Sequence, residues 1–404
     1  MSELNYLEKL LDGAEVEWKS LSELASLRRG RVMSKGYFVD NIGEYPVYSS
    51  QTANSGMIGS IDTFDFDGEF VSWTTDGANA GTVFYRTGKF SITNVCGLIK
   101  INDNSPLNYK YLFYWLSIEA KSHVYSGMGN PKLMSHQVEK IPVPIPCPNN
   151  PEKSLAIQSK IVRILDKFTA LTAELTAELN IRKKQYNYYR DQLFSFNTED
   201  VPHLPMGQKD IGEFIRGGTF QKKDFIDAGV GCIHYGQIYT YYGTYTEKTK
   251  TYISTALAKK CKKAQKGDLI IATTSENDED VCKAVAWLGS EDIAVNSDAC
   301  IYKHNLNPKY VSYFFQTEQF QNQKRQYITG AKVRRVNADN LSKILIPVPS
   351  MEIQERIVSI LDKFDTLTNS ITEGLPREIE LRQKQYEYYR DLLFSFPKPD
   401  SVTN

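Results

Sequence analysis

The chain has 404 residues, of which 41% are hydrophobic and 24% are charged, as is usual for a globular protein of two or three domains. Its 48 basic and 48 acidic side chains cancel, so net charge argues neither for nor against a nucleic-acid partner, and only local clusters can do so. No run approaches the roughly 18 apolar residues of a membrane span, and the acidic start MSELNYLEKLLDG is unlike a secretory signal, so we expect no membrane partner.

The chain consists of two variable regions that alternate with two copies of one repeat. The string QYNYYRDQLFSF that ends at Phe196 returns with two substitutions at Phe396, and IVRILDKF that ends at Phe168 returns with one substitution at Phe364. We therefore predict a first variable domain at 1–150, a first helical segment at 151–197, a second variable domain at 198–350, and a second helical segment with a tail at 351–404.

The first repeat predicts one long helix, because no Pro or Gly interrupts 152–196 and Pro151 is a suitable first residue. Such a helix would measure about 65–70 Å. Its apolar residues recur at alternating steps of three and four, the spacing of a coiled-coil seam. The second repeat carries the same stripe with four further residues, near Gly374 and Pro376, where we expect a kink or short break. We expect the two helices to pack against each other as an antiparallel spacer.

The variable regions match only faintly. Arg29-Gly30 corresponds to Arg216-Gly217, Gln51 to Gln237, Thr74-Thr75 to Thr273-Thr274, and the segment 107–116 to 306–315. This pattern predicts two binding modules of one fold whose surface residues differ.

Six cysteines form no CxxC pair, which is typical of reduced thiols in a cytosolic protein. The alternative is a zinc site made by Cys232, His234, Cys261, Cys300 and His304, although Cys-x-His is not a recurrent spacing in structural sites. We expect no metal in this chain.

Several segments resemble the specificity subunit of type I restriction–modification enzymes, in particular the type IC branch. They are YLEKLLDGAEVEWKSL at 6–21, NPEKSLAIQSKIVRILDKFTALTAELTAELN at 150–180, RKKQYNYYRDQLFSF at 182–196 and the whole of 352–396. The resemblance is close over both repeats and only architectural in the variable regions.

The resemblance implies an α+β fold in which two similar target recognition domains are separated by an antiparallel coiled coil of two long helices. Each domain would read one half of a bipartite double-stranded DNA target, and the number of TAEL copies, two at 172–179, would set the gap. Two modification subunits would methylate adenine with S-adenosylmethionine, and a restriction subunit would translocate DNA with ATP and Mg. This chain would itself be non-catalytic, hold no cofactor, and act in the bacterial cytoplasm.

One departure from the family lies at the start of the second domain. The segment EVEWK at 15–19 has no counterpart in NTEDVPHLPMGQKDIGEF at 197–214, and the alignment places Pro205 opposite Trp18. How the first strand of this domain is anchored stays open.

Motifs of catalysis are missing from the sequence. It contains no P-loop, no GxGxxG that opens a helix, and no NPPY-type tetrapeptide of methyltransferases. Asp12 with Glu17-Trp18-Lys19 fits a nuclease-like pattern, but a surface strand explains it more simply. A self-sufficient nuclease or methyltransferase, which would modify DNA alone, and a coiled-coil scaffold, which would tolerate neutral residues at Lys132, Arg334 and Arg335, are the alternative functions.

Three basic clusters are candidates for contact with DNA phosphates, although each is also compatible with a plain solvated surface. They lie around Arg28–Lys35, Lys248–Lys266 and Lys324–Lys343. Base readers should be polar or basic residues on loops. The residues predicted to contact DNA are Arg28, Arg29, Arg31, Lys35, Ser49, Gln51, Thr74, Thr75, Asn79, Lys132, Lys222, Lys223, Tyr235, Gln237, Thr273, Thr274, Lys332, Arg334 and Arg335; the preferred base readers are Gln51, Gln237, Lys132, Arg334 and Arg335.

The tyrosine-rich helix ends suggest a surface for partner subunits. Tyr186 and Tyr189 fall on the seam and should pack there, whereas Tyr188 leaves it. The residues predicted to dock partners are Tyr188, Arg190, Tyr388 and Arg390.

Overall fold

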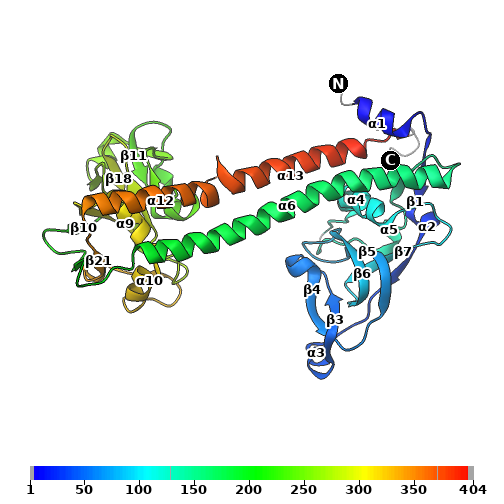
Figure 1. Ribbon diagram of the computed structural model, residues 1–404, viewed down its shortest axis with the longest axis horizontal. Helices are drawn as coiled ribbons and strands as arrows, with labels where there is room; N and C mark the ends of the chain where they lie inside the picture. Colours follow the sequence, from blue (N-terminus) through cyan, green and yellow to red (C-terminus); the bar gives the residue numbers. More distant parts are fainter. Residues whose placement is uncertain (1–3, 128, 371, 399–404) are drawn as a thin grey trace. The chain divides into compact units, whose positions relative to one another are not determined.

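A computed structural model describes residues 4–127, 129–370 and 372–398 (Figure 1). The chain forms two compact units, Met1–Ala173 with Glu380–Asn404, and Glu174–Ile379. Each unit thus combines one variable region with a part of each repeat. Among the described helices, none has the length and apolar character that crossing a membrane requires.

The first unit is built on a sheet between residues 25 and 101. In chain order its elements are α1 (Leu4–Leu11), β1 (Val16–Ser20), α2 (Leu21–Leu24), β2 (Ala25–Arg29), α3 (Lys35–Asp40), β3 (Ile42–Tyr48), η1 (Ala53–Gly56), β4 (Met57–Ile61), β5 (Phe66–Thr74), β6 (Val83–Ile92), β7 (Cys96–Ile101), α4 (Tyr109–Glu119), η2 (Ala120–His123), α5 (Ser135–Val138), β8 (Pro142–Pro146) and the first part of α6 (Pro151–Leu193). The strand order in this sheet is β2-β7-β5-β6-β3-β4, in which β3 and β6 pair in parallel, while β1 pairs with β8.

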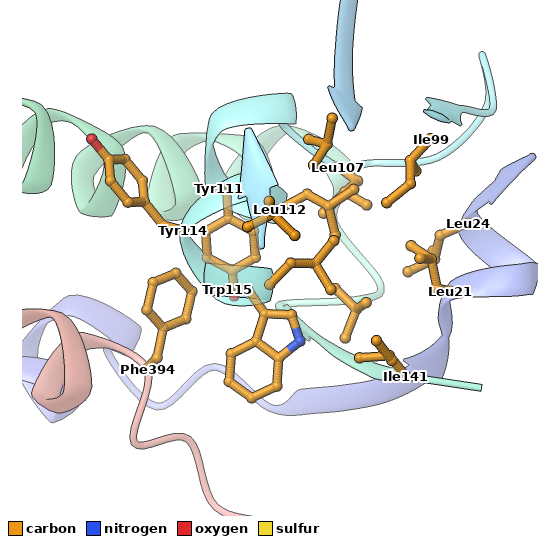
Figure 2. Packing of buried hydrophobic residues seen from close by; sticks show 14 of the residues in the cluster. Leu21, Leu24, Ile99, Leu107, Tyr111, Leu112, Tyr114, Trp115, Ile141 and Phe394 are labelled. Carbon is orange, nitrogen blue, oxygen red and sulfur yellow. The ribbon is translucent and has the colours of Figure 1, made fainter. Parts of the chain in front are cut away.

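Helix α4 lies at the centre of the first core (Figure 2). Asn108 caps this helix by accepting hydrogen bonds from the backbone N–H groups of its first turn. Phe394, from the end of the second repeat, packs against Tyr111 and Trp115 with ring centroids 5.1 and 5.7 Å apart. The end of the second repeat is therefore part of the core of the first domain.

The second unit contains the same kind of sheet in shorter pieces. Its elements are the later part of α6, β9 (His203–Pro205), β10 (Gly212–Arg216), η3 (Lys222–Asp224), β11 (Val230–Ile233), α7 (Tyr235–Thr240), β12 (Tyr245–Thr246), β13 (Thr251–Ile253), α8 (Thr255–Ala258), β14 (Lys263–Ala264), β15 (Leu269–Ala272), β16 (Thr274–Ser275), β17 (Ala284–Trp287), β18 (Ile293–Val295), β19 (Ala299–His304), α9 (Pro308–Phe314), α10 (Glu318–Arg325), β20 (Arg334–Arg335), α11 (Ala338–Leu341), β21 (Leu345–Pro347), α12 (Met351–Asn369) and the start of α13 (Gly374–Leu393). The larger sheets have the orders β10-β19-β15-β17-β12 and β13-β11-β18-β14, and β16-β20 and β21-β9 form two-stranded sheets of their own.

The second core repeats the packing of the first. Asn307 caps α9, and Phe194, from the end of the first repeat, stacks on Tyr310 with ring centroids 4.7 Å apart. Phe194 also lies 5.9 Å from the ring of Phe314. Each repeat thus ends in the core of the unit that contains the other domain. The predicted α+β fold with two similar domains is confirmed.

Within each unit the two repeats run antiparallel. In the second unit, Tyr189 of α6 stacks on Phe364 of α12. Just beyond the end of α6, Phe194 stacks on Tyr310 of α9, and the N–H of Asn307, which caps α9, donates to Gln354 Oε1 near the start of α12 (2.9 Å). The later part of α6 therefore lies near the earlier part of α12. The first unit has the matching stack of Phe168 on Tyr389, at 5.3 Å. Seam packing of the tyrosines is confirmed.

The second repeat is interrupted where its sequence predicts. Helix α12 ends at Asn369 and α13 begins at Gly374, whose φ of +74° lies in the left-handed region. A Cβ on Gly374 would come within 2.4 Å of the Thr366 carbonyl oxygen, so glycine is required at this point. In the first repeat, helix α6 is continuous from Pro151 to Leu193. It therefore ends three residues before Phe196, where the sequence predicts its end.

The start of the second domain corrects the alignment with the first. Tyr111 Oη donates to the carbonyl of Pro144 at 2.8 Å, and Tyr310 Oη donates to that of Pro347 at 3.0 Å, so these prolines are equivalent. Trp18 pairs with Pro144 in β1·β8, and His203 pairs with Pro347 in β9·β21. His203, and not Pro205, is therefore the counterpart of Trp18. The sequence alignment is two residues off because the register of these short strands is set by their pairing with β8 and β21.

Candidate nucleic-acid interface

Three loops of the first domain converge beyond the ends of β5 and β7. Thr75 donates its backbone N–H to the Val95 carbonyl (3.1 Å), and its own carbonyl accepts from the N–H of Leu133 (2.9 Å). Asp76 forms an isolated bridge with Lys132, whose Nζ lies 3.9 Å from Asp76 Oδ1. These bonds hold the predicted residues Thr75 and Lys132 side by side.

The second domain makes the same arrangement of loop-to-loop hydrogen bonds, called the loop frame below, from different residues. Thr273 donates its N–H to the Asp298 carbonyl (2.9 Å) and accepts from the N–H of Val336 (3.1 Å). The next residue, Thr274 in β16, pairs with Arg335 in β20. The predicted residues Thr273, Thr274 and Arg335 are thus brought together.

Matching the two frames shifts the predicted correspondence by one residue. Thr75 is equivalent to Thr273, and Asp76 is equivalent to Thr274. Thr74 is therefore equivalent to the residue before Thr273 and not to Thr273 itself. The faint match of the two Thr-Thr pairs was wrong in register because a two-residue identity does not specify strand pairing.

A close backbone crossing fixes the position of each Arg-Gly pair. A Cβ on Gly30 would lie 2.1 Å from the Ile92 carbonyl oxygen, and one on Gly217 would lie 2.2 Å from that of Asn296. No larger residue fits at either crossing without a shift of the backbone. The predicted correspondence of these glycines is confirmed.

The arginines before these glycines lie at the edge of the frame. Arg29 Nη2 donates to the Asn94 carbonyl (3.1 Å), and Arg216 Nε donates to the Ser297 carbonyl (3.2 Å). Both side chains are exposed and keep further N–H groups for a ligand.

The remaining basic candidates differ in how far they are engaged within the protein. Arg31 pairs with Asp65 (3.0 Å) and lies over the ring of Tyr37. Arg334 pairs with Asp278 (2.8 Å). Besides Arg29, the exposed cationic side chains among the predicted residues are Arg28, Lys35, Lys132, Lys222, Lys223, Lys332 and Arg335.

The two glutamines preferred as base readers hold their own loops. Gln51 Nε2 donates to the Met57 carbonyl at 2.6 Å. Gln237 donates to Thr251 Oγ1 (3.0 Å), and its Oε1 accepts from the N–H of His234 (2.9 Å). Both side chains follow equivalent strands, β3 and β11, but their amides brace the backbone.

The other polar candidates also make contacts within their domains. Ser49 Oγ lies 2.9 Å from Thr93 Oγ1, and Asn79 Nδ2 donates to the Ser50 carbonyl (3.4 Å). The Thr74 hydroxyl donates to the Asn79 carbonyl. Tyr235 packs against the ring of His234, with centroids 4.7 Å apart.

A buried arginine that the sequence did not single out supports a loop of the first domain. Arg86 Nη2 donates to the Ser55 carbonyl (2.8 Å) and its guanidinium lies 3.6 Å from the ring centroid of Tyr48. Asn54 and Ser55 both have positive φ, 49° and 52°. Burial lowers the pKa of Arg86 to about 10, so it stays charged at neutral pH.

Lys324 plays a related part in the second domain. The prediction that it belongs to a phosphate-binding cluster is therefore wrong. Its side chain is buried, and its Nζ donates to the carbonyls of Glu279 (3.0 Å) and Val281 (2.9 Å). Burial lowers the pKa of this amine. The sequence places Lys324 among other charged residues, whereas in the structure it shares the buried face of α10 with Phe320, one helical turn earlier.

The five candidate zinc ligands do not converge. Cys232 and Cys261 belong to one core cluster and Cys300 to another, while His304 Nδ1 accepts from the backbone N–H of Leu306. Within the described residues, no three His, Cys, Asp or Glu side chains are grouped to hold a metal ion.

The predicted docking residues fall into two groups. Tyr188 and Tyr388 are exposed on their helices, with 61% and 45% of their surface accessible. Arg190 is buried and donates to Asn187 Oδ1 (3.0 Å), and Arg390 pairs with Asp391 (2.8 Å). Tyr188 and Tyr388 are therefore more exposed than Arg190, as are Tyr189 (48%) and Tyr389 (41%) on the same helices.

Comparison with known proteins finds one family repeated twice along the chain. The family model of the type I restriction modification DNA specificity domain matches residues 14–182 and 205–381. The chain is 41% identical to the type I restriction enzyme EcoR124I/EcoR124II specificity subunit of Escherichia coli over the full length of both. It is 33% identical to a putative type I specificity subunit of Haemophilus influenzae, with 97% of this chain and 98% of the relative covered.

Two solved structures are similar in fold. A type I system S subunit from M. genitalium gives a TM-score of 0.56 at 14% identity, covering 96% of this chain and 98% of that one. A chain from a study of complex assembly in the type I R-M system gives 0.60 at 12% identity, covering 94% and 97%. At these identities the likeness concerns the fold.

Proposed function

This chain belongs to the type I restriction modification DNA specificity family, and we propose that it directs such a system to a bipartite double-stranded DNA target. Each recognition domain reads one half of the target, and the repeats set the gap between the halves. The chain is the specificity component and not the methylating or cutting one.

The doubled loop frame is the observation that carries this proposal. Equivalent hydrogen bonds place Arg29, Thr75 and Lys132 in one domain and Arg216, Thr273 and Arg335 in the other. A shared frame with different side chains is what two readers of different sequences require, because base edges are distinguished by their pattern of donors and acceptors. The exposed cations around each frame supply contacts with phosphates.

The tandem TAEL segment is proposed to determine the gap. It occupies 172–179, without Pro or Gly, inside the continuous helix α6, and the limit between the compact units, Ala173/Glu174, falls within it. Each TAEL adds about one helical turn, roughly 6 Å, without a break in the helix. A change in copy number therefore alters length while both domains keep their surfaces.

The proposed partners are two modification subunits and a restriction subunit. The modification subunits supply S-adenosylmethionine-dependent methylation of adenine, and the restriction subunit supplies ATP- and Mg-dependent translocation. Tyr188 and Tyr388 are candidate contacts because both are exposed at equivalent positions of the two repeats. In this proposal the complex acts on DNA in the bacterial cytoplasm.

The test is to insert a third TAEL after Leu179 and to map methylated adenines across the genome of cells that carry the complex. The gap of the methylated motif is expected to lengthen, while both half-sites keep their sequences. The double substitution Thr172→Ala and Thr176→Ala keeps the helix length and should leave the gap as it was.

An unchanged gap after the insertion would contradict the proposal that the TAEL segment determines the gap. An altered half-site sequence would contradict the proposal that the two domains read DNA independently of the gap. A coiled-coil scaffold without DNA contact predicts that the motif is insensitive to every change in this chain. Nothing in the two loop frames favours that alternative.

A further inference from the structure

The second domain contains a cavity at the frame, with a volume of about 290 Å³. Thr274 and Arg335, which pair across β16 and β20, line it together with Arg216 and Asp298. Arg216 and Arg335 are exposed and Asp298 is half-buried, so the residues that line this cavity include both cationic and anionic side chains.

One buried group in this cavity lacks a partner. Thr274 is only 6% exposed, and its Oγ1 makes no hydrogen bond to any described residue. Its neighbour Thr273 differs, because Thr273 Oγ1 donates to the Asp298 carbonyl at 2.9 Å. A buried hydroxyl without a partner destabilises the folded protein unless a ligand completes its bonding.

The charges of the cavity select the ligand. A phosphate would meet Arg216 and Arg335 favourably, but the carboxylate of Asp298 would repel it. A base edge carries no net charge and presents amino donors beside ring-nitrogen or keto acceptors. Resting on the proposed function, we infer that Thr274, Arg335 and Asp298 read the major-groove edge of one base pair in the half-site of the second domain.

The first domain fills the equivalent positions differently. Asp76 takes the place of Thr274 and Lys132 that of Arg335, and their charged groups lie 3.9 Å apart. Asp76 Oδ2 also accepts from Thr75 Oγ1 at 2.6 Å. This pair therefore presents a cation beside a carboxylate where the second domain presents a hydroxyl and a guanidinium.

The experiment uses the full chain assembled with its modification subunits. Wild type, Thr274→Val and Arg335→Ala are tested for methylation of DNA libraries in which one base pair at a time is varied across both half-sites. Each variant is expected to lose about tenfold or more discrimination at a single position of one half-site. The other half-site should be read as before, and Lys132→Ala should affect that other half-site instead.

Two further measurements separate a base contact from the alternatives. Binding of Arg335→Ala should keep the salt dependence of wild type, because a base contact releases no counterion. A slope of log K against log salt reduced by about one would make Arg335 a phosphate contact and overturn the inference. Without DNA, Thr274→Val should keep or raise the wild-type Tm, because it removes a buried hydroxyl that has no partner among the described residues. Thr273→Val should lower the Tm through loss of the bond to the Asp298 carbonyl. A lowered Tm for Thr274→Val would show that the hydroxyl serves the fold.

The outcomes also distinguish this inference from the proposed function. A wild-type complex without a bipartite motif would defeat the proposed function. A wild-type complex with such a motif, combined with variants that leave every position unchanged or weaken all sequences equally, would defeat only the reading role of Thr274 and Arg335.

Discussion

The two domains hold one loop frame but close it with different chemistry. In the first, Lys132 and Asp76 meet across the paired segments, while in the second Arg335 stays exposed beside a cavity and a buried, unpartnered Thr274 hydroxyl. The backbone bonds of Thr75 and Thr273 are the same. The backbone geometry is therefore shared, while the side chains at the paired positions differ, with Asp76 and Lys132 in one domain and Thr274 and Arg335 in the other.

The sheets show the same division. In the first domain β6 pairs with β5 along one part and in parallel with β3 along another. In the second domain these pairings are divided between β17 and β18. One long strand and two short ones thus support equivalent loops, so the frame does not depend on an unbroken strand.

The largest effect is expected at the reciprocal aromatic contacts. Phe394→Ala removes the ring that packs on Tyr111 and Trp115, and Phe194→Ala removes the one that stacks on Tyr310. Each truncation of a buried Phe should lower the free energy of unfolding by about 3–5 kcal/mol, measured by urea denaturation.

Hydrogen exchange would locate these two losses. Phe394→Ala should deprotect α4, and Phe194→Ala should deprotect α9, although each Phe is far in sequence from the helix it covers. Greater deprotection of the domain that precedes the mutated repeat in sequence would refute the reciprocal packing.

A smaller effect is expected at the two buried cations. Arg86→Met leaves the Ser55 carbonyl without its donor, and Lys324→Met does the same to Glu279 and Val281. Each should reduce the free energy of unfolding by about 1–3 kcal/mol, measured by thermal denaturation of the full chain.

Salt titrations of DNA binding would separate the structural role of these cations from contact with phosphates. Neither substitution should change the salt slope, because neither buried charge is available to a phosphate. A reduced slope for Lys324→Met would return this residue to the phosphate-binding cluster. Lys332→Ala is the matched surface control, since Lys332 is exposed.

Features that depend on local sequence were predictable. The near-identical strings and the heptad-like spacing predicted α6, α12 and α13, and the Gly374–Pro376 region marked the break between the last two. Helix periodicity and glycine conformation act within a few residues of the chain, so one sequence contains the necessary signal.

Features set by long-range pairing were not predictable. The counterparts Trp18 and His203 became clear only through the strands β8 and β21 that they face. Gln51 was predicted as a base reader, but its amide bonds the Met57 carbonyl. A polar residue on a loop can bind a ligand or brace its own backbone, and the sequence pattern is the same for both.

The smallest effect concerns a contact that both units share but bury to different degrees. Lys110 pairs with Asp166 at 2.6 Å in the first unit, and Lys309 pairs with Asp362 at 2.7 Å in the second. The side chains of the first pair are 39% and 37% exposed, and those of the second are 21% and 29% exposed. Solvent therefore screens the first pair more strongly.

Replacing each aspartate with asparagine removes the charge and keeps an acceptor for the tyrosine that donates to it, Tyr114 or Tyr313, at 2.7 Å. Burial, followed by the bond to Asp362, raises the pKa of Tyr313, so it remains a donor. Asp362→Asn should cost about 1 kcal/mol of unfolding free energy and Asp166→Asn about 0.5 kcal/mol or less, with both losses reduced in 1 M salt, where screening acts within about 3 Å. Equal losses that do not respond to salt would mean that the carboxylates act through the tyrosine bonds alone, and the difference in burial between the two units would then have no energetic consequence.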